Sequence, residues 1–211
     1  ERAAARDRLG TAAGDVLILC VGTVCERKNQ GELVQAFAAL PTQLQARARL
    51  VIVGLTDCEY SDRVRSLVEA LPPWLAARVT LTPETRDVER FYRAADIFAF
   101  ASTMESYPLV ILEAMSHGLP IVTTRVFGVV DQVREGRNAL FFTPGDGREL
   151  AGKLELLLED AVLRQRMGAA SLEVLDSLSN YGDMVDAYHE LVIQAAALHS
   201  ESGASCARAP G

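Results

Sequence analysis

The sequence predicts an α/β fold: a Rossmann-like, doubly wound parallel sheet of about six strands with helices on both faces. Short apolar runs alternate with longer segments of helical periodicity over most of the 211 residues. The apolar runs are continuous, which is typical of parallel strands that are buried on both faces. Polar and charged residues collect directly after these runs, where such sheets bind their ligands.

The composition argues against several classes of function. A net charge of -7 disfavours nucleic acid or an anionic membrane surface as the main partner. No apolar run approaches the roughly 20 residues of a membrane-spanning helix. The four cysteines match no zinc pattern and indicate a reducing, cytoplasmic location, with a Cys20–Cys25 pairing as a minor alternative. None of the three histidines has a companion at metal-ligand spacing, so no metal site is predicted.

The length of 211 residues suits one domain with a single core. We expect residues 1–14 to form a linker helix and turn, residues 15–198 to form the domain, and residues 199–211 to be a disordered tail. The chain begins inside a helical pattern without an initiating Met, so we expect it to be part of a longer protein.

The expected elements alternate along the chain. Apolar runs predict strands at 15–21, 49–53, 79–81, 97–101, 121–124 and 139–142. Periodicity and boundary residues predict helices at 32–40, 60–71, 87–95, 108–117, 149–158, 162–167, 170–178 and 181–198, with a short helix near 128–133. Asp87 suits the N-cap of its helix. Phe91 and Tyr92 are expected to pack into the core rather than to stack on a base.

The segment 105–122 (ESYPLVILEAMSHGLPIV) is the most informative part of the chain. Pro108 suits the first position of a helix, and Gly118 and Pro120 suit its end. A buried strand and a polar turn precede this helix, so its N-terminus points outward at the carboxyl edge of the sheet. Free N–H groups and the helix dipole make such an end attractive to anions.

Two carboxylates flank the start of this predicted helix. Glu105 lies in the turn before it, where a negative charge also stabilises the helix dipole. Glu113 lies inside it among apolar neighbours, so we expect a partly buried carboxylate with a hydrogen-bond partner. Carboxylates accept hydrogen bonds from sugar hydroxyls. The two glutamates are therefore candidates to hold hydroxyl-bearing groups on either side of a phosphate.

A basic pair follows the first predicted strand. Arg27 and Lys28 stand between that strand and the next helix, in the segment 21–30 (VGTVCERKNQ). Surface charge alone would explain an arbitrary Arg–Lys pair, but loops after parallel strands line the ligand crevice. An arginine grips phosphate oxygens with two donors and a lysine supplies a mobile charge. The pair is therefore a candidate phosphate site.

The segment 105–122, with its Glu-x7-Glu spacing, resembles the signature of retaining glycosyltransferases built from two Rossmann-like domains, the GT-B architecture. The resemblance continues through segment 21–30 and through the later turns to the Pro-Gly-Asp at 144–146. It implies that the chain is the C-terminal, donor-binding half of such an enzyme. There are two departures: Thr23 stands where the family often has arginine, and Asp131 and Gln132 stand where it usually has glutamate.

The resemblance assigns roles to residues that match the motif. It implies catalytic roles for Glu105, Lys28 and Arg27, although Arg27 takes the place of the missing arginine only from a shifted position. The implied donor-binding residues are Gly22, Thr23, Lys28, Thr82, Ser106, Tyr107, Pro108, Leu109 and Glu113. Glu113 would bind the ribose, Glu105 the transferred sugar, and the loop 82–85 the base, largely through backbone groups.

The resemblance also implies the ligands and partners. The donor would be a UDP- or GDP-linked sugar, with no obligatory metal because basic residues and a helix dipole replace the cation. The acceptor, a glycan, lipid or small molecule, would bind a missing N-terminal domain, and peripheral membrane contact through that domain stays open. We therefore expect poor turnover by this chain alone and an exposed apolar strip where the other domain docks.

Three alternative functions remain at this stage. A non-catalytic nucleotide-binding module would need Glu113 and the basic loop but not Glu105. A sugar-nucleotide epimerase of the same architecture would place further acids in both domains. A simple dinucleotide-binding domain is disfavoured because no Gly-x-Gly-x-x-Gly pattern follows Gly22.

Overall fold

The computed structural model describes residues 2–178, 182–183, 188–191 and 193, in two units. The first unit extends to Asp176 and contains the sheet. In the second unit, the described residues 182–183, 188–191 and 193 are helical, and the rest of the helix predicted at 181–198 lies outside the described residues, as does the predicted tail at 199–211. The proposed division into linker, domain and tail stays a prediction.

The first unit is a six-stranded parallel sheet with the order β3-β2-β1-β4-β5-β6, which confirms the predicted fold class. Its register runs without interruption along the central pair, from Val16 opposite Ala48 to Val21 opposite Val53. The strands are β1 (Val16–Val21), β2 (Ala48–Leu55), β3 (Val79–Pro83), β4 (Ile97–Phe100), β5 (Ile121–Thr124) and β6 (Ala139–Phe142).

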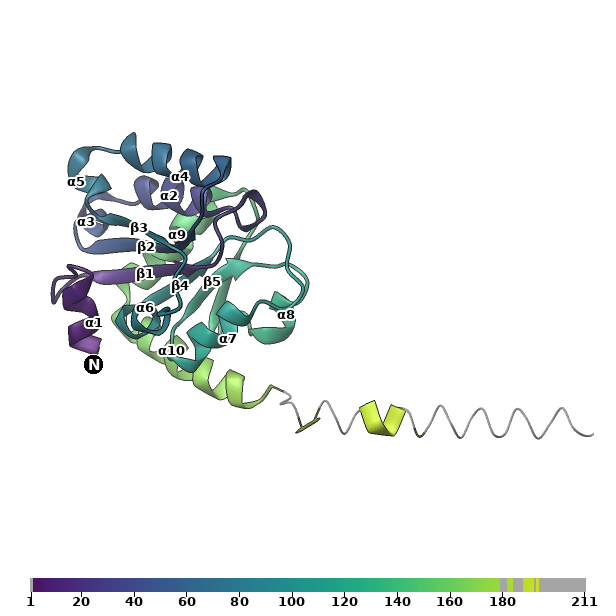
Figure 1. Cartoon of the computed structure of the whole chain (residues 1–211). Coiled ribbons are helices and arrows are strands. Elements are labelled where there is room, and N and C mark those ends of the chain that lie inside the picture. Colours follow the sequence, from purple (N-terminus) through teal and green to yellow (C-terminus); the bar gives the residue numbers. More distant parts are fainter. Residues whose placement is uncertain (1, 179–181, 184–187, 192, 194–211) are drawn as a thin grey trace, which may run out of the picture. The chain divides into compact units, whose positions relative to one another are not determined.

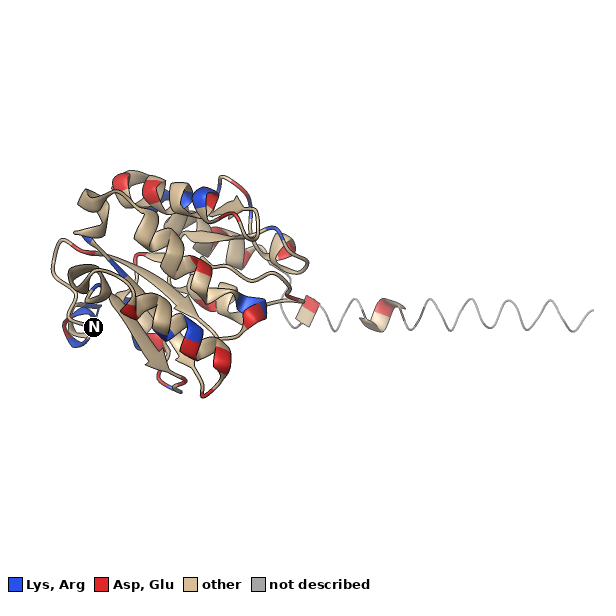
Figure 2. Ribbon diagram, turned by 90° about the horizontal axis from the view of Figure 1, so that it is seen from above, with Lys and Arg blue, Asp and Glu red and all other residues tan. Residues whose placement is uncertain are grey.

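Helices cover both faces of this sheet (Figure 1). One face carries α2 (Gln30–Ala39), α3 (Thr42–Gln45), α4 (Glu59–Glu69), α5 (Pro73–Ala76) and α9 (Gly147–Glu159). The other carries α1 (Arg2–Arg8), α6 (Glu89–Ala94), α7 (Leu109–Ser116) and α10 (Ala161–Asp176), with α8 (Val129–Gln132) beside α7. Charged residues occupy mainly the helices and loops, while the strands at the centre are mostly uncharged (Figure 2).

The core explains why the apolar runs became strands. Every residue of β1 is buried, and Leu17, Ile18 and Leu19 have no exposed surface. Full burial of one such side chain contributes about 1.5–3 kcal/mol to folding. Phe91 and Tyr92 are 1% and 2% exposed, which confirms that they pack inward.

Several predicted boundaries were wrong for local reasons. Pro108 precedes α7 instead of starting it, since its extended backbone places it at the N-cap. Asp87 does not cap α6, which begins at Glu89 after Val88 and without a side-chain cap. β3 continues to Pro83 through its pairing with β2, so Thr82 lies in a strand rather than a loop. Cys20, Cys25 and Cys58 are free, so the alternative pairing of Cys20 with Cys25 is wrong.

The helices predicted at 162–167 and 170–178 are one helix, α10. Gly168 lies in the interior of α10, at the predicted break, and contacts the backbone of Gly118. A Cβ atom added at Gly168 would lie 2.2 Å from the carbonyl oxygen of Gly118, at the end of α7. The absence of a side chain thus allows the backbones of α10 and the turn after α7 to touch.

Substitution of Gly168 tests this close packing. Gly168→Ala should lower the free energy of unfolding by about 1–3 kcal/mol, even though alanine favours helices, because the new methyl group clashes with backbone. The matched control is Gly152→Ala on α9, where nothing lies within 4 Å of the new Cβ. The control should be neutral or stabilising by up to about 1 kcal/mol. Equal effects in chemical denaturation would contradict the packing argument.

Candidate functional site

The strand order reverses beside β1, and this reversal positions the site. From β1 the chain proceeds to β2 and β3 on one side, then returns to place β4, β5 and β6 on the other. The loops that leave the carboxyl ends of β1 and β4 therefore diverge, and the crevice between them is where open α/β sheets bind ligands. The loop after β1 contains a 3₁₀ turn, Glu26–Lys28, and the loop after β4 leads into α7.

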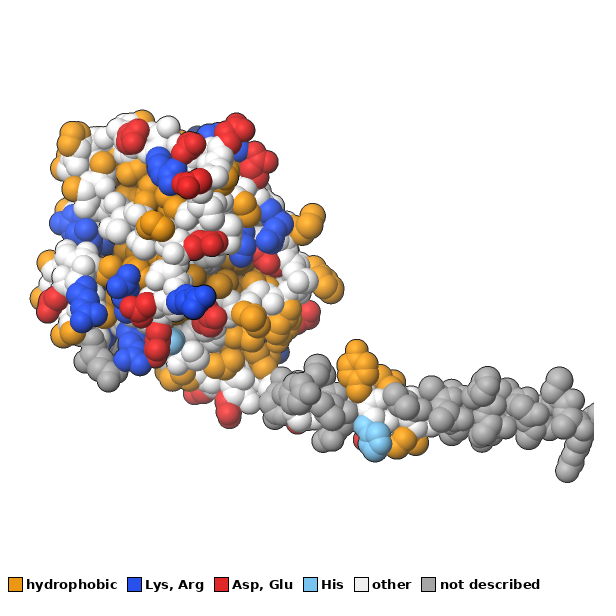
Figure 3. All heavy atoms as spheres, in the orientation of Figure 1, with side chains coloured by type: hydrophobic (Ala, Val, Ile, Leu, Met, Phe, Trp, Pro, Cys, Tyr) orange, Lys and Arg blue, Asp and Glu red, His pale blue; other side chains and the backbone are white. Residues whose placement is uncertain are grey.

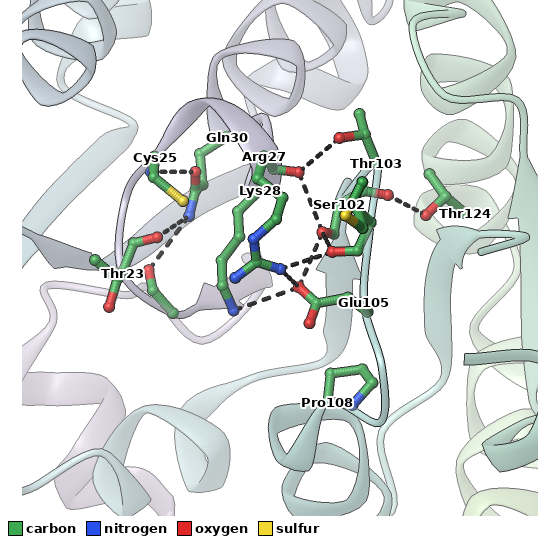
Figure 4. A network of polar contacts seen from close by, with 12 residues as sticks. Thr23, Cys25, Arg27, Lys28, Gln30, Ser102, Thr103, Glu105, Pro108 and Thr124 are labelled. Carbon is green, nitrogen blue, oxygen red and sulfur yellow. Dashed lines mark hydrogen bonds and ion pairs between the residues drawn. The ribbon is translucent and has the colours of Figure 1, made fainter. Parts of the chain in front are cut away.

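The three residues predicted to be catalytic meet across this crevice (Figure 4). Arg27 Nη1 lies 2.7 Å from Glu105 Oε1, and Lys28 Nζ lies 3.6 Å from the same oxygen. Arg27 also donates to the carbonyl oxygen of Met104 at 2.6 Å. One carboxylate oxygen thus faces two cations from the opposite loop. We call these residues the Arg27–Lys28–Glu105 cluster.

The cluster is partly shielded from water. The side chains of Glu105 and Lys28 are only 9% and 14% exposed, while that of Arg27 is 45% exposed. Lys28 Nζ also lies 5.0 Å from the centre of the Phe100 ring. A Cβ atom added at Gly22 would lie 3.0 Å from Lys28 Nζ, and Gly22 has a φ of 140° that disfavours side chains. Gly22 therefore leaves the space that the lysine occupies.

Short polar side chains join the two loops. Ser102 is fully buried, and its hydroxyl lies within donating distance of three acceptors: Glu105 Oε1 at 2.9 Å and the carbonyl oxygens of Arg27 and Met104, both at 3.1 Å. The backbone N–H of Thr103 donates to the Arg27 carbonyl at 2.8 Å. Sequence reasoning missed Ser102. The available indication was a small polar residue directly after a buried strand at the switch point.

Gln30 is a second residue that sequence reasoning missed. It is fully buried at the start of α2, and its Nε2 donates to the carbonyl oxygens of Gly22 and Thr23. Its Oε1 accepts from the backbone N–H of Cys25 at 3.3 Å. A single amide thus holds the loop after β1 in shape. A buried polar side chain in this role is not distinguishable by pattern from a surface glutamine.

Glu113 has the expected partner but not the expected burial. The hydroxyl of Tyr92, on α6, donates to Glu113 Oε2 at 2.7 Å. Burial of Tyr92, reinforced by this hydrogen bond, raises the pKa of its phenol, so the hydroxyl keeps the proton that it donates. Glu113 itself is exposed. Its carboxylate is oriented by Tyr92 and open to a ligand.

The start of α7 lies beside the cluster. Pro108 is buried, whereas Ser106, Tyr107 and Leu109 are exposed, the last two by 45% and 66%. A Cβ atom added at Gly128 would lie 1.5 Å from the carbonyl oxygen of Ser106, so the loop after β5 packs backbone to backbone against this turn. The first turn of a helix leaves N–H groups without intrahelical acceptors. These donors point toward the carboxyl edge of the sheet.

A pocket of about 390 Å³ adjoins the cluster at Gly22. It lies at the carboxyl ends of β1, β2 and β3, and its size is typical of small-ligand sites. Thr23 and Glu84 meet at its wall, where Thr23 Oγ1 donates to Glu84 Oε1 at 2.7 Å. Thr82 is not among the lining residues, which are Val21, Gly22, Thr23, Val53, Gly54, Glu84, Thr85, Arg86 and Val88.

Two kinds of feature are absent from the described residues. Among them, no group of three or more His, Cys, Asp or Glu side chains is arranged to hold a metal ion. In the same part of the chain, no helix combines the length and the apolar character needed to cross a membrane.

Exposed apolar residues lie next to the crevice. Hydrophobic side chains gather over α7 and α8 (Figure 3). Met104 and Phe127 are 68% and 78% exposed, and Tyr107, Leu109 and Val130 are also exposed. This is the kind of surface that the sequence predicted for contact with another domain, and the docking itself stays a prediction.

The family model for glycosyl transferases group 1 matches residues 1–174. The chain belongs to this family. This confirms the family suggested by the segment 105–122.

Similar proteins include the D-inositol 3-phosphate glycosyltransferase of Nocardia farcinica, 35% identical over 172 residues that cover 80% of this chain and 38% of that protein. The sulfoquinovosyl transferase SQD2 of Arabidopsis thaliana is 32% identical over 160 residues, which cover 74% of this chain and 29% of that protein. The part of each relative that this chain matches is thus well under half of that relative's length.

Solved structures share the fold. Anabaena HepE in complex with UDP has a TM-score of 0.80 at 23% identity, covering 92% of this chain and 52% of that one. Sucrose-phosphate synthase from Thermosynechococcus elongatus has a TM-score of 0.77 at 27% identity, covering 93% of this chain and 49% of that one. The arrangement of strands and helices is therefore that of one half of these larger proteins.

The ion pairs of the cluster can be tested through stability. Glu105→Gln removes the shared partner of two cations, one of them largely buried, so the free energy of unfolding should fall by about 1–3 kcal/mol. In a Lys28→Met background the same Glu105→Gln change should lower the free energy of unfolding by less, because the largely buried lysine charge that Glu105 compensates is then absent. Glu135→Gln, which breaks an exposed pair with Arg125, is the control and should change stability by less than about 1 kcal/mol. Additive effects of the Glu105 and Lys28 substitutions in urea denaturation would argue against the coupling.

Proposed function

We propose that the chain is the donor-binding domain of a retaining glycosyltransferase, which transfers a sugar from a UDP- or GDP-linked donor to an acceptor. The observation that carries the proposal is the Arg27–Lys28–Glu105 cluster. It places two cations and a shielded carboxylate at the switch point of the sheet, beside the start of α7. This combination suits a ligand that has a diphosphate next to a sugar.

The basic side of the cluster would bind the diphosphate. Lys28 Nζ and the Arg27 guanidinium would neutralise its charge and stabilise it as the leaving group. Further hydrogen bonds would come from backbone N–H groups at the start of α7. The donors are those of Ser106, Tyr107 and Leu109, since Pro108 between them has no N–H. Positive charge from these groups would stand in for a metal ion, so no obligatory metal is part of the proposal.

The carboxylates would bind hydroxyl groups on either side. When the diphosphate pairs with Arg27 and Lys28, Glu105 would be released from part of its ion pairing and accept hydrogen bonds from the transferred sugar. Glu113, held by Tyr92, would accept from the ribose. The base would enter the pocket beside Gly22, lined by the segment 84–86 that follows Thr82.

The rest of the enzyme would complete the reaction. The acceptor, a glycan, lipid or small molecule, would bind a second domain that contacts the exposed apolar residues around α7 and α8. Transfer would occur in the cleft between the two domains, so this chain alone would turn over poorly. The proposed setting is the cytoplasm, where nucleotide sugars are available, with any membrane contact made through the other domain.

Thermal unfolding with nucleotides tests the donor site. A nucleoside diphosphate at one hundred times its Kd should stabilise the chain by about 2.7 kcal/mol. Lys28→Ala and Glu113→Ala should each reduce this shift, because they remove a phosphate contact and a ribose contact. Lys153→Ala, on the outer face of α9, is a matched control and should leave the shift unchanged. A shift that survives in both site variants would contradict the proposed donor site.

The same measurement separates a transferase from a nucleotide-binding module. Glu105→Ala should weaken binding of the sugar conjugate more than binding of the free nucleoside diphosphate, since only the conjugate has a sugar to contact. Equal weakening of both ligands would favour a module that does not recognise the sugar.

A further inference from the structure

The wall of the pocket beside Gly22 contains a carboxylate that accepts a hydrogen bond from a neighbouring loop. Glu84 follows β3, and its Oε1 accepts from the hydroxyl of Thr23, which follows β1, at 2.7 Å. Glu84 is exposed toward the pocket that it lines. The hydrogen bond from Thr23 therefore orients a carboxylate that keeps acceptor capacity on both of its oxygens.

The rest of the pocket suits a flat ring. Its apolar lining comes from Val21, Val53 and Val88. The backbones of Gly22 and Gly54 lie so close that a Cβ atom at Gly54 would be 2.3 Å from the Gly22 carbonyl oxygen. Gly22 and Gly54 contribute only backbone atoms to the lining of the pocket. The proximity of Lys28 Nζ to Gly22 places the phosphate-binding side next to the same pocket.

The chemistry of a carboxylate acceptor distinguishes the bases. An ionised carboxylate has two acceptor oxygens and no donor. Guanine presents two adjacent donors, N1–H and the N2 amino group, on one edge. Uracil presents a single N3–H between two carbonyl oxygens, which would repel a carboxylate. In adenine and cytosine the amino group stands beside a ring nitrogen that accepts, so the same repulsion applies.

We infer that Glu84, held by Thr23, selects guanine, so that the donor is a GDP-linked sugar. This inference rests on the proposed function and concerns the base only. Arg86 lines the same pocket, and its guanidinium is a donor of the kind that guanine O6 accepts. The two hydrogen bonds from guanine N1–H and the N2 amino group to the Glu84 carboxylate are charge-assisted and therefore stronger than neutral ones. Both would be lost with uracil, adenine or cytosine.

Calorimetric titration of the chain with GDP, IDP and UDP tests the inference. Inosine diphosphate (IDP) is the informative probe. Its base, hypoxanthine, has the N1–H and O6 of guanine but lacks the N2 amino group. In the wild type, GDP should bind at least tenfold more tightly than UDP and several-fold more tightly than IDP. In Glu84→Ala the affinity for GDP should fall at least tenfold, and GDP and IDP should become equal. Thr23→Val removes the hydroxyl that donates to Glu84 but keeps the shape of the side chain, so the affinity for GDP should fall by less than in Glu84→Ala.

The outcomes separate this inference from the proposed function. Binding of GDP and UDP with equal affinity, dependent on Lys28 but unaffected by Glu84→Ala, would overturn the guanine assignment and leave the donor site in place. Tighter binding of UDP than GDP would do the same. Absence of binding by all three nucleotides to the folded chain would overturn both.

Discussion

The site depends on one ionic contact across the sheet, between Glu105 on the loop after β4 and the pair Arg27 and Lys28 on the loop after β1. β1 and β4 are neighbours in space because the strand order reverses between them, although they are far apart in the chain. Buried polar contacts from Ser102 and Gln30 keep both loops in place. Without the reversal, these charges would lie on separate parts of the surface.

The charges of this contact bear on how the proposed diphosphate would bind. Glu105 supplies one negative charge against the two positive charges of Arg27 and Lys28, so the cluster keeps a net positive charge. A bound diphosphate would offer the cations a stronger partner and leave Glu105 able to accept from a sugar. Ligand binding would thus exchange one set of ion pairs for another instead of desolvating free charges. The glycines at 22, 54 and 128 allow the close backbone approaches on which this geometry rests.

The sequence was sufficient for the fold and for the residues that meet at the switch point. Continuous apolar runs predicted all six strands, because burial on both faces leaves a clear pattern. Glu105, Arg27 and Lys28 were predictable because the loops after parallel strands all leave the same edge of the sheet, where they line the ligand crevice. The burial of Glu113 was mispredicted because apolar neighbours along a helix do not show which faces are covered. The break predicted between the helices at 162–167 and 170–178 was wrong, because the role of Gly168 in α10 depends on its tertiary contact with Gly118. Ser102, Gln30 and the Thr23–Glu84 contact were missed because each depends on which loops lie side by side.

The claim that the cluster binds a diphosphate is tested most directly by the ratio of affinities for a nucleoside diphosphate and the matching monophosphate. The account predicts that the wild-type chain prefers the diphosphate by at least tenfold, since Lys28 and Arg27 make charge-assisted bonds to the second phosphate. Lys28→Ala should reduce this preference to a few-fold, while Lys153→Ala should preserve it. A preference that is unchanged in Lys28→Ala would contradict the account, because the diphosphate would then bind away from the cluster.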